Sequence, residues 1–394
     1  MRMKVLFIFG TRPEAIKLGP VIREMQDRPG DFDVRVCVTG QHREMLDQVL
    51  KAFDVKVGDD LNVMRPSQTI YGSTSRIIAA LESVMSKYKP DLVLVQGDTT
   101  TTLCGALGAF YSKVPVGHVE AGLRTGDVYA PFPEEMNRLL TSRLAAVHFA
   151  PTETAAQNLY REGVRRCTVT VTGNTGIDAV LQVTEALERR KLQGLTGLDQ
   201  DSTKKLIVVT AHRRESFGPG LEHICGALNH LARRSDVEIV YPVHPNPNVQ
   251  AVVSRSLLGQ RNITLLAPLD YVSFVDLMRR SYLLLTDSGG IQEEAPALGK
   301  PVLVLREVTE RPEAVTAGTS VLVGTDEDRI VANAERLIED PNAYQQMARR
   351  HSPYGDGKAS VRIVDLLALG TAGFARLFAG ASVPATFQIE ATHS

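Results

Sequence analysis

The run VLFIFGTRPE, from Val5 to Glu14, joins a short, continuously apolar segment to a glycine turn and then to a helix start. An uninterrupted apolar strand is typical of a parallel sheet whose two faces are both covered by helices. Thr11 and Glu14 have the spacing of a capping box, in which each side chain accepts a hydrogen bond from the other residue's backbone amide. The run therefore predicts the strand–turn–helix unit of an α/β protein.

The same alternation continues along the chain and predicts two sets of strands. The expected strands are Val5–Phe9, Val34–Thr39, Leu92–Val95, Val116–Val119 and Val169–Thr172, then Leu206–Thr210, Glu238–Val243, Ile263–Leu266, Tyr282–Thr286 and Val302–Leu305. The expected helices include Glu14–Met25, Glu44–Ala52, Thr101–Tyr111, Leu221–Arg233, Phe274–Arg280 and Arg329–Ile338. Strands that alternate with helices in this way predict two Rossmann-like, doubly wound α/β domains.

The boundary between the two halves is expected after Gly173-Asn174, where helix Ile177–Lys191 leads into a polar stretch. We therefore expect a first domain over residues 1–174 and a second over 175–352. Residues 353–369 would hold a last helix, Ala359–Leu369. The Gly- and Ala-rich tail, residues 370–394, is interrupted by Arg376 and by glycines, which favours a packed or frayed terminus over a membrane anchor.

The composition excludes several classes of protein. Among 394 residues, 44 Lys and Arg balance 45 Asp and Glu, whereas a general nucleic-acid binder would show a basic excess. No run of about twenty uninterrupted apolar residues occurs, so we expect no transmembrane helix. The four cysteines form no Cys-x-x-Cys pair, which favours a reduced, cytoplasmic protein without a disulfide framework or a zinc knuckle.

Common cofactor and metal motifs are absent from the sequence. There is no Gly-x-x-x-x-Gly-Lys-Ser/Thr phosphate loop, and no Gly-x-Gly-x-x-Gly follows the first strand. His-Glu-x-x-His is missing as well. We therefore expect neither an NTPase nor an ordinary NAD enzyme, and no bound metal or other cofactor.

Three carboxylates follow predicted strands of the first half, where ligands bind in open α/β sheets. Asp98 comes after Leu92–Val95, Glu120 comes directly after Val116–Val119, and Glu134 stands at an expected helix start a few residues further on. Asp98, or one of the threonines that follow it, could simply be the N-cap of a helix. A helix-dipole contact could account for Glu134. Together, the three acids could serve acid/base chemistry on one substrate.

The second half supplies groups that suit an anion. The run TDSGGIQEE, Thr286 to Glu294, reads as a strand end, a turn of small residues and a helix start whose amides can bind a diphosphate. His212 lies beside two arginines at another strand end, although a lone histidine is more often structural. Arg12 at the first helix start and Arg311 are further candidates for an anion contact. These residues indicate an enzyme that acts on a nucleotide sugar in a cleft between the domains.

Taken as a set, the motifs resemble those of the non-hydrolysing UDP-N-acetylglucosamine 2-epimerases. The matching stretches are Phe9–Lys17, Thr39–Leu50, Gly97–Thr102, Pro115–Asp127, Pro133–Arg138, Thr172–Ala179, His212–Gly218, Tyr241–His244, Thr286–Lys300, Thr309–Gly318 and Pro353–Gly357. The resemblance implies a glycosyltransferase-B-like fold with the last helix crossing back onto the first domain, and a homodimer. It also implies reversible interconversion of UDP-N-acetylglucosamine (UDP-GlcNAc) and UDP-N-acetylmannosamine (UDP-ManNAc), which would supply cell-surface polysaccharide synthesis.

The resemblance also assigns individual residues. It places acid/base roles on Asp98, Glu120 and Glu134, and places His212 near the pyrophosphate. The implied UDP contacts are Arg12, Lys17, Phe274, Ser288, Gly289, Gly290, Glu294 and Arg311. A second UDP-GlcNAc molecule, acting as an activator, would be expected at Gln41, His42, Arg213 and His244.

The chemistry of such a reaction requires loss of UDP before the inversion. The hydrogen on C2 is poorly acidic because no neighbouring carbonyl stabilises a carbanion. Elimination of UDP to 2-acetamidoglucal, followed by re-addition, avoids that carbanion. Alternative functions are epimerisation of a UDP 2,3-diacetamido sugar, a glycosyltransferase of the same fold, a hydrolysing epimerase, and a nucleotide-sugar-binding regulatory protein without catalysis.

Overall fold

The computed structural model describes residues 2–40, 43–65, 68–198, 203–213, 216–348 and 353–369. The chain divides into two compact units: unit 1 comprises Met1–Ala179 and Gly355–Ser394, and unit 2 comprises Val180–Tyr354. The first boundary lies inside helix α7 (Thr175–Glu188), and the second precedes the last helix, α15 (Ala359–Ala368).

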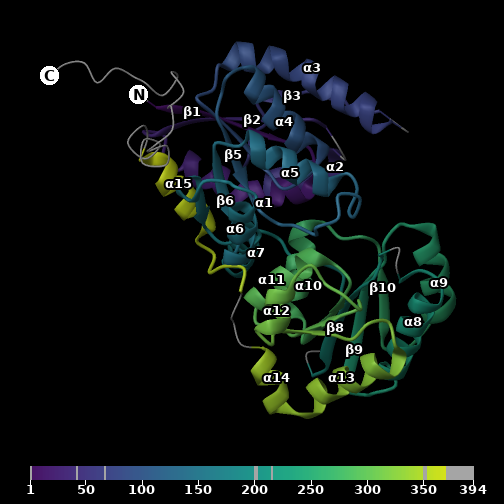
Figure 1. Ribbon diagram of the computed structural model, residues 1–394. Helices are drawn as coiled ribbons and strands as arrows, with labels where there is room; N and C mark the ends of the chain where they lie inside the picture. Colours follow the sequence, from purple (N-terminus) through teal and green to yellow (C-terminus); the bar gives the residue numbers. More distant parts are fainter. Residues whose placement is uncertain are drawn as a thin grey trace, which may run out of the picture. The chain divides into compact units, whose positions relative to one another are not determined.

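Unit 1 is built on a parallel sheet in the order β3-β2-β1-β4-β5-β6-β7 (Figure 1). Its strands are β1 (Met3–Phe9), β2 (Phe32–Val38), β3 (Asp59–Asp60), β4 (Leu92–Gln96), β5 (Val116–Val119), β6 (Val147–Ala150) and β7 (Val169–Val171). Its helices are α1 (Arg12–Gln26), α2 (Arg43–Ala52), α3 (Ile70–Tyr88), α4 (Thr100–Tyr111), α5 (Glu134–Leu144), α6 (Glu153–Arg161), the short 3-10 turn η1 (Arg166–Thr168), the start of α7, and α15.

Unit 2 repeats the design with a parallel sheet in the order β10-β9-β8-β11-β12-β13. Its strands are β8 (Lys205–Thr210), β9 (Val237–Pro242), β10 (Ile263–Leu266), β11 (Leu283–Thr286), β12 (Val302–Val304) and β13 (Ser320–Leu322). Its helices, after the end of α7, are α8 (Pro219–Leu231), α9 (Pro247–Leu257), α10 (Tyr271–Arg280), α11 (Gly289–Ala297), α12 (Pro312–Thr316), α13 (Glu327–Glu339) and α14 (Pro341–Met347). Both sheets confirm the prediction of an α/β, doubly wound fold.

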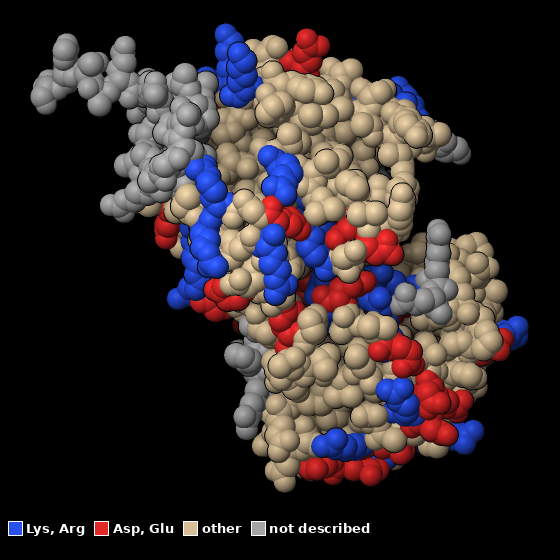
Figure 2. Space-filling model, viewed as in Figure 1, with Lys and Arg blue, Asp and Glu red and all other residues tan. Residues whose placement is uncertain are grey.

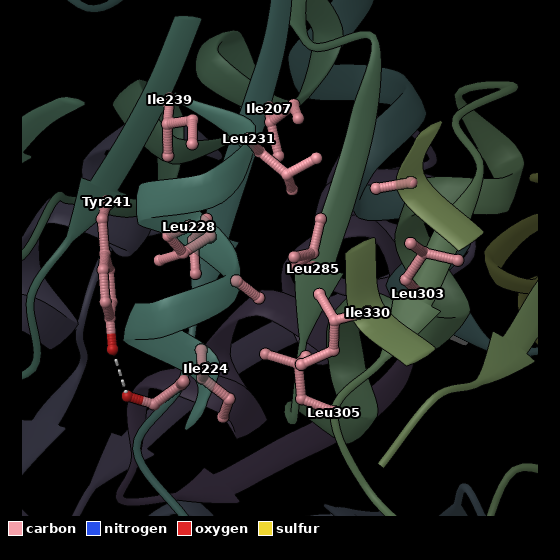
Figure 3. Close-up of a cluster of buried hydrophobic side chains, with 14 of the residues drawn as sticks. Ile207, Ile224, Leu228, Leu231, Ile239, Tyr241, Leu285, Leu303, Leu305 and Ile330 are labelled. Carbon is pink, nitrogen blue, oxygen red and sulfur yellow. Dashed lines mark hydrogen bonds between the residues drawn. The ribbon is translucent and has the colours of Figure 1, made fainter. Parts of the chain in front are cut away.

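The core of unit 2 lies between its sheet and the helices α8, α9 and α13. Figure 3 shows Leu228 and Leu231 of α8 packed with Ile207 of β8 and Ile239 of β9, all of them fully buried. Tyr241 is the one labelled side chain with a polar end, and its hydroxyl donates to the carbonyl oxygen of Ala211 at 2.8 Å (Figure 3). This apolar core therefore also holds the backbone that follows β8.

Helix α15 returns to unit 1 and packs on α1 (Figure 1). Lys358, at its N-cap position, makes no side-chain capping bond in the described structure. Asp178 of α7 takes over this function, because its carboxylate accepts from the backbone amides of Ala359 at 3.2 Å and Ser360 at 2.7 Å, and from the Ser360 hydroxyl at 2.6 Å. Burial raises the pKa of Asp178, while these three bonds favour its ionised form. The last helix thus crosses back onto the first unit, as the family resemblance implies.

The predicted strands are confirmed, and their ends shift by at most two residues. Val116–Val119 and Ile263–Leu266 lie at the predicted positions. The predictions do not include β3, β6 or β13. These strands are short, and β6 carries His148 within its four residues, so none of them gives a continuous apolar run.

The surface and the cysteines add two observations. Acidic and basic side chains lie beside one another on the face shown in Figure 2, in line with the even balance of charges. Cys37, Cys104 and Cys225 are buried, Cys167 is exposed, and all four are free thiols.

Among the residues that the structure describes, no helix has both the length and the hydropathy needed to cross a membrane.

We expect Asp178→Ala to lower the free energy of unfolding of unit 1. The substitution leaves two buried backbone amides without an acceptor, and each unsatisfied group costs about 1–3 kcal/mol. Urea unfolding followed by circular dichroism measures the loss. Ser360→Ala is the matched control, because it removes only the hydroxyl bond and keeps both amides capped, so its effect should be clearly smaller. Equal midpoints for Asp178→Ala and the unsubstituted chain would contradict this account of α15.

Candidate active site

The three predicted acids lie at the carboxyl edge of the sheet of unit 1. Strands β4 and β5 are parallel neighbours, with Gln96 paired to Val119. Asp98 follows the end of β4, and Glu120 follows the end of β5. Glu134 is the first residue of α5, as predicted. Parallel pairing therefore places Asp98 and Glu120 at one edge of one sheet.

The turn after β4 is held by two residues of the neighbouring strand β5. Gly97 has a φ of +73°, donates its amide to the Val119 carbonyl at 3.0 Å, and accepts from the His118 ring at 2.7 Å. Burial lowers the pKa of His118 to about 3, so the ring is neutral at physiological pH. Thr99, and not Asp98, is the N-cap of α4. Capping therefore does not explain Asp98.

Asp98 faces an arginine that the sequence analysis missed. Its Oδ2 atom lies 2.8 Å from Arg138 Nε and 2.7 Å from Arg138 Nη2. Its backbone carbonyl accepts from the side-chain Nδ2 of Asn137 at 2.9 Å. Arg138 also donates to Glu135, a buried carboxylate that accepts from the backbone amides of Thr125 and Gly126. The spacing of Glu135 and Arg138, three residues apart on one helix, is the sequence signal for this pair.

Glu120 adopts a φ of +64°, which is uncommon for a residue with a side chain. Its carboxylate accepts from Gln96 Nε2 at 3.0 Å and from Lys17 Nζ. Lys17, one of the expected UDP contacts, thus pairs with one of the acids within unit 1. Strained backbone at the end of a buried strand is a common feature of functional sites.

The helix start after β1 is organised around Glu14. The predicted capping box is confirmed, with Thr11 as the N-cap of α1. The Glu14 carboxylate also accepts from Gly10 N at 3.0 Å, from the Thr99 hydroxyl at 2.8 Å and from the Thr102 hydroxyl at 3.1 Å. Burial raises the pKa of Glu14. Glu14 therefore joins the start of α1, where Arg12 lies, to the start of α4 just after Asp98, beyond its role as a cap.

The anion-binding candidates of unit 2 gather where β8 and β11 end. These strands are parallel neighbours, with Thr210 paired to Thr286. Asp287 accepts from the backbone amides of His212 at 2.6 Å and Arg213 at 2.7 Å. The rings of His212 and His244 stack, with centroids 5.0 Å apart. Asp287 holds the backbone of the loop after β8, and the sequence analysis gave it no role of its own.

The start of α11 has the predicted form. Ser288 is its N-cap residue, and Gly289 and Gly290 open its first turn. A Cβ atom added at Gly289 would lie 3.8 Å from Arg311 Nη2, and one added at Gly290 would lie 3.8 Å from Glu294 Oε1. Arg311 and Glu294, two of the expected UDP contacts, therefore flank this turn. Arg311 is oriented by the buried Glu293, to which its Nε donates. Phe274 lies half-buried in α10.

The candidate activator residues are only partly covered by the structure. Gln41 and His42 lie outside the described residues. His244 is exposed, and its Nδ1 accepts from the amide of Asn246 at 3.2 Å. Within the described ranges, no group of three His, Cys, Asp or Glu side chains is placed to hold a metal ion.

Comparisons with known proteins agree on one family. A family model described as UDP-N-acetylglucosamine 2-epimerase matches residues 23–368. The chain is 56% identical over 370 residues to the UDP-N-acetylglucosamine 2-epimerase of Escherichia coli K12, covering 93% of this chain and 98% of that protein. It is 48% identical over 378 residues to the protein of the same name from Campylobacter jejuni, covering 94% and 98%.

Solved structures give the same result. The UDP-GlcNAc 2-epimerase of Neisseria meningitidis, bound to UDP-GlcNAc, superposes with a TM-score of 0.86 at 50% identity and covers 93% of this chain and 99% of that one. The Methanocaldococcus jannaschii enzyme in complex with UDP-GlcNAc and UDP gives a TM-score of 0.75 at 33% identity, over 93% and 100%. The chain therefore belongs to the non-hydrolysing UDP-N-acetylglucosamine 2-epimerase family and is an isomerase.

Proposed function

We propose that the chain interconverts UDP-GlcNAc and UDP-ManNAc by eliminating UDP and adding it back. In the first step the bond between C1 and the β-phosphate oxygen breaks, and its electron pair leaves with UDP. The proton on C2 passes to a carboxylate, and the C1–C2 double bond of 2-acetamidoglucal forms. In the second step a proton is delivered to the opposite face of C2, and UDP adds to C1.

The observation that carries this proposal is the set of oriented carboxylates in unit 1. Inversion needs proton transfer on both faces of the sugar, so one carboxylate is not enough. Asp98 is held by Arg138, and Glu120 is held by Lys17 and Gln96. Glu134, at the start of α5, supplies a third acid. Each acid/base group contributes about 10²–10⁴ in rate.

The leaving diphosphate requires positive charge and hydrogen-bond donors. In this proposal the amides at Ser288, Gly289 and Gly290, with Arg311 and His212, bind the diphosphate, and Glu294 accepts from the ribose hydroxyls. Arg12, Lys17 and Phe274 complete the UDP contacts. The solved relatives from Neisseria meningitidis and Methanocaldococcus jannaschii are bound to UDP-GlcNAc, which supports the same substrate here.

The proposal also covers the compartment, the cofactors and the activator of the enzyme. We propose that it acts in the cytoplasm, without metal or other cofactor, and that UDP-ManNAc supplies cell-surface polysaccharide synthesis. A second UDP-GlcNAc would act as an activator at Gln41, His42, Arg213 and His244. Of this set, the exposed His244 ring stacks on His212, which gives the proposed activator site a direct contact with the proposed diphosphate site.

A homodimer is the proposed oligomeric state, and an apolar surface of unit 1 supports it. Helix α3 packs on α4, and α4 packs on α5. The exposed large apolar side chains on these helices and the loop before α5 are Ile70, Tyr71, Phe110, Tyr111, Tyr129, Phe132, Met136 and Leu140. Exposed apolar side chains gathered on neighbouring elements are typical of an interaction site. A second copy of the chain is the partner that we propose.

We expect the unsubstituted chain to convert UDP-GlcNAc alone into a mixture with UDP-ManNAc, and Asp98→Asn to slow this conversion by about 10²–10⁴. The asparagine keeps the shape of the side chain but cannot carry the proton. Proton and phosphorus NMR on the same sample measure both sugars and the anomeric phosphate.

Asp91→Asn is the matched control for that substitution. Asp91 stands just before β4, at the opposite end of the same strand, where its carboxylate accepts from the amide of Lys4 at 2.8 Å. An asparagine there keeps an acceptor oxygen, so the rate should be unchanged. A chain that is inactive until a sugar acceptor is added, or that releases free N-acetylmannosamine, would overturn the proposed function.

Leu140→Glu should convert the dimer to a monomer, because a charge would be buried in the apolar surface. Light scattering after size exclusion should give twice the 43.0 kDa chain mass for the unsubstituted protein and one chain mass for the variant. Leu258→Glu, at an exposed leucine of unit 2, is the control and should stay dimeric. Identical masses for Leu140→Glu and the unsubstituted chain would contradict the proposed interface.

A further inference from the structure

Asp287 is a buried carboxylate that reaches from the end of β11 to the loop after β8. Its side chain is 0% exposed. Oδ2 accepts from the backbone amides of His212 and Arg213, and Oδ1 lies 3.2 Å from Nδ1 of the His212 ring. Oδ2 therefore holds the backbone at His212, while Oδ1, which forms no hydrogen bond among the described residues, meets the imidazole as a close charged neighbour.

Asp287 is ionised at physiological pH. Burial alone would raise its pKa, but the contact with the His212 ring and the two backbone amides outweigh burial, and its pKa lies below its ordinary value. An ionised carboxylate can only accept hydrogen bonds. A lone pair on the nitrogen that faces it, His212 Nδ1, would be repelled at 3.2 Å, so this contact favours a proton on Nδ1.

With a proton on Nδ1, the charge of the ring depends on the other nitrogen, Nε2. With Nδ1–H facing Asp287, the neutral ring has a lone pair on Nε2, and any proton that Nε2 carries makes the ring a cation. The ring is also fixed in its plane by His244, which stacks at an interplanar angle of 11°. The backbone before His212 is held independently, through the bond from the Tyr241 hydroxyl to Ala211.

We propose that Asp287 is a positioning residue that keeps a proton on Nδ1 of His212, so that Nε2 can give a second proton to the departing diphosphate and leave a neutral ring. This inference rests on the proposed function, in which His212 contacts that diphosphate. When the bond from C1 to oxygen breaks, the Nε2 proton is shared with the β-phosphate oxygen that leaves, and the ring becomes the neutral Nδ1–H form. When UDP adds back, the proton returns to Nε2.

An asparagine at position 287 isolates this effect. Its amide oxygen can still accept from the two backbone amides, so the loop after β8 keeps its anchor. Its NH₂ group would face Nδ1 and donate to it, which forces the opposite tautomer, with the proton on Nε2 of a neutral ring. If a ring in that tautomer gave up its Nε2 proton, an imidazolate anion would remain, so proton transfer to the departing oxygen is blocked in the variant.

The test combines a spectroscopic signature with kinetics. In the full chain with ¹⁵N-labelled histidine, NMR at alkaline pH should show His212 as the Nδ1–H tautomer and, in Asp287→Asn, as the Nε2–H tautomer. The His212 signals are assigned by their loss in His212→Gln. Asp287→Asn should lower kcat by about 10²-fold or more with a smaller change in KM. In the His212→Gln background, Asp287→Asn should cause no further loss, because it acts through that ring.

Tyr241→Phe is the matched control, since it removes a bond to the same loop without touching the imidazole. It should keep the Nδ1–H signature of His212. An unchanged tautomer in Asp287→Asn would overturn the inference and leave the proposed function standing, as would an equal loss of kcat with and without His212. Full activity of His212→Gln would overturn the inference together with the proposed role of His212. Absence of epimerisation in the unsubstituted chain would overturn the proposed function and the role of His212 in it, whereas the NMR signature tests the effect of Asp287 on the ring without turnover.

Discussion

Parallel pairing of neighbouring strands is the constraint on which the rest of this structure depends. In a parallel sheet all strands end at one edge, so residues distant in sequence meet there without any further device. Pairing of β4 with β5 brings Asp98 and Glu120 to one edge, and pairing of β8 with β11 brings His212 to Asp287. The candidate residues of each unit are therefore brought together by the backbone hydrogen bonds of neighbouring strands.

Buried carboxylates then fix the loops at that edge. Glu14 ties the loop after β1 to the loop after β4, and Glu135 holds Arg138 and the amides of Thr125 and Gly126. Asp287 does the same for the loop after β8, and Asp178 for the start of α15. A carboxylate can accept several hydrogen bonds at once, which suits it to gather the free amides of a loop. Such anchors hold loop residues in the fixed positions that catalysis requires.

The sequence predicts the strands because buried parallel strands are continuous apolar runs, as in Val116–Val119. It also predicts the capping box of α1 and the turn at Ser288–Gly290, since both are local patterns. Arg138 and Asp287 could not be assigned in this way, because their partners Asp98 and His212 are 40 and 75 residues away. Such pairs exist only once the sheet has formed. Helix α3 is not among the expected helices, although its buried Ile77 and Leu81 are four residues apart, which is a helical spacing that the sequence shows.

Removal of the C2 proton as UDP leaves, and its return on the other face, is the central claim of the account, and exchange of the C2 hydrogen with solvent tests this proton transfer directly. Epimerisation of UDP-GlcNAc would be run in D₂O and the product analysed by proton NMR. Because the proton leaves to one carboxylate and returns from the other face, the account predicts deuterium at C2 of UDP-ManNAc. Product that retains the original hydrogen at C2 would contradict it.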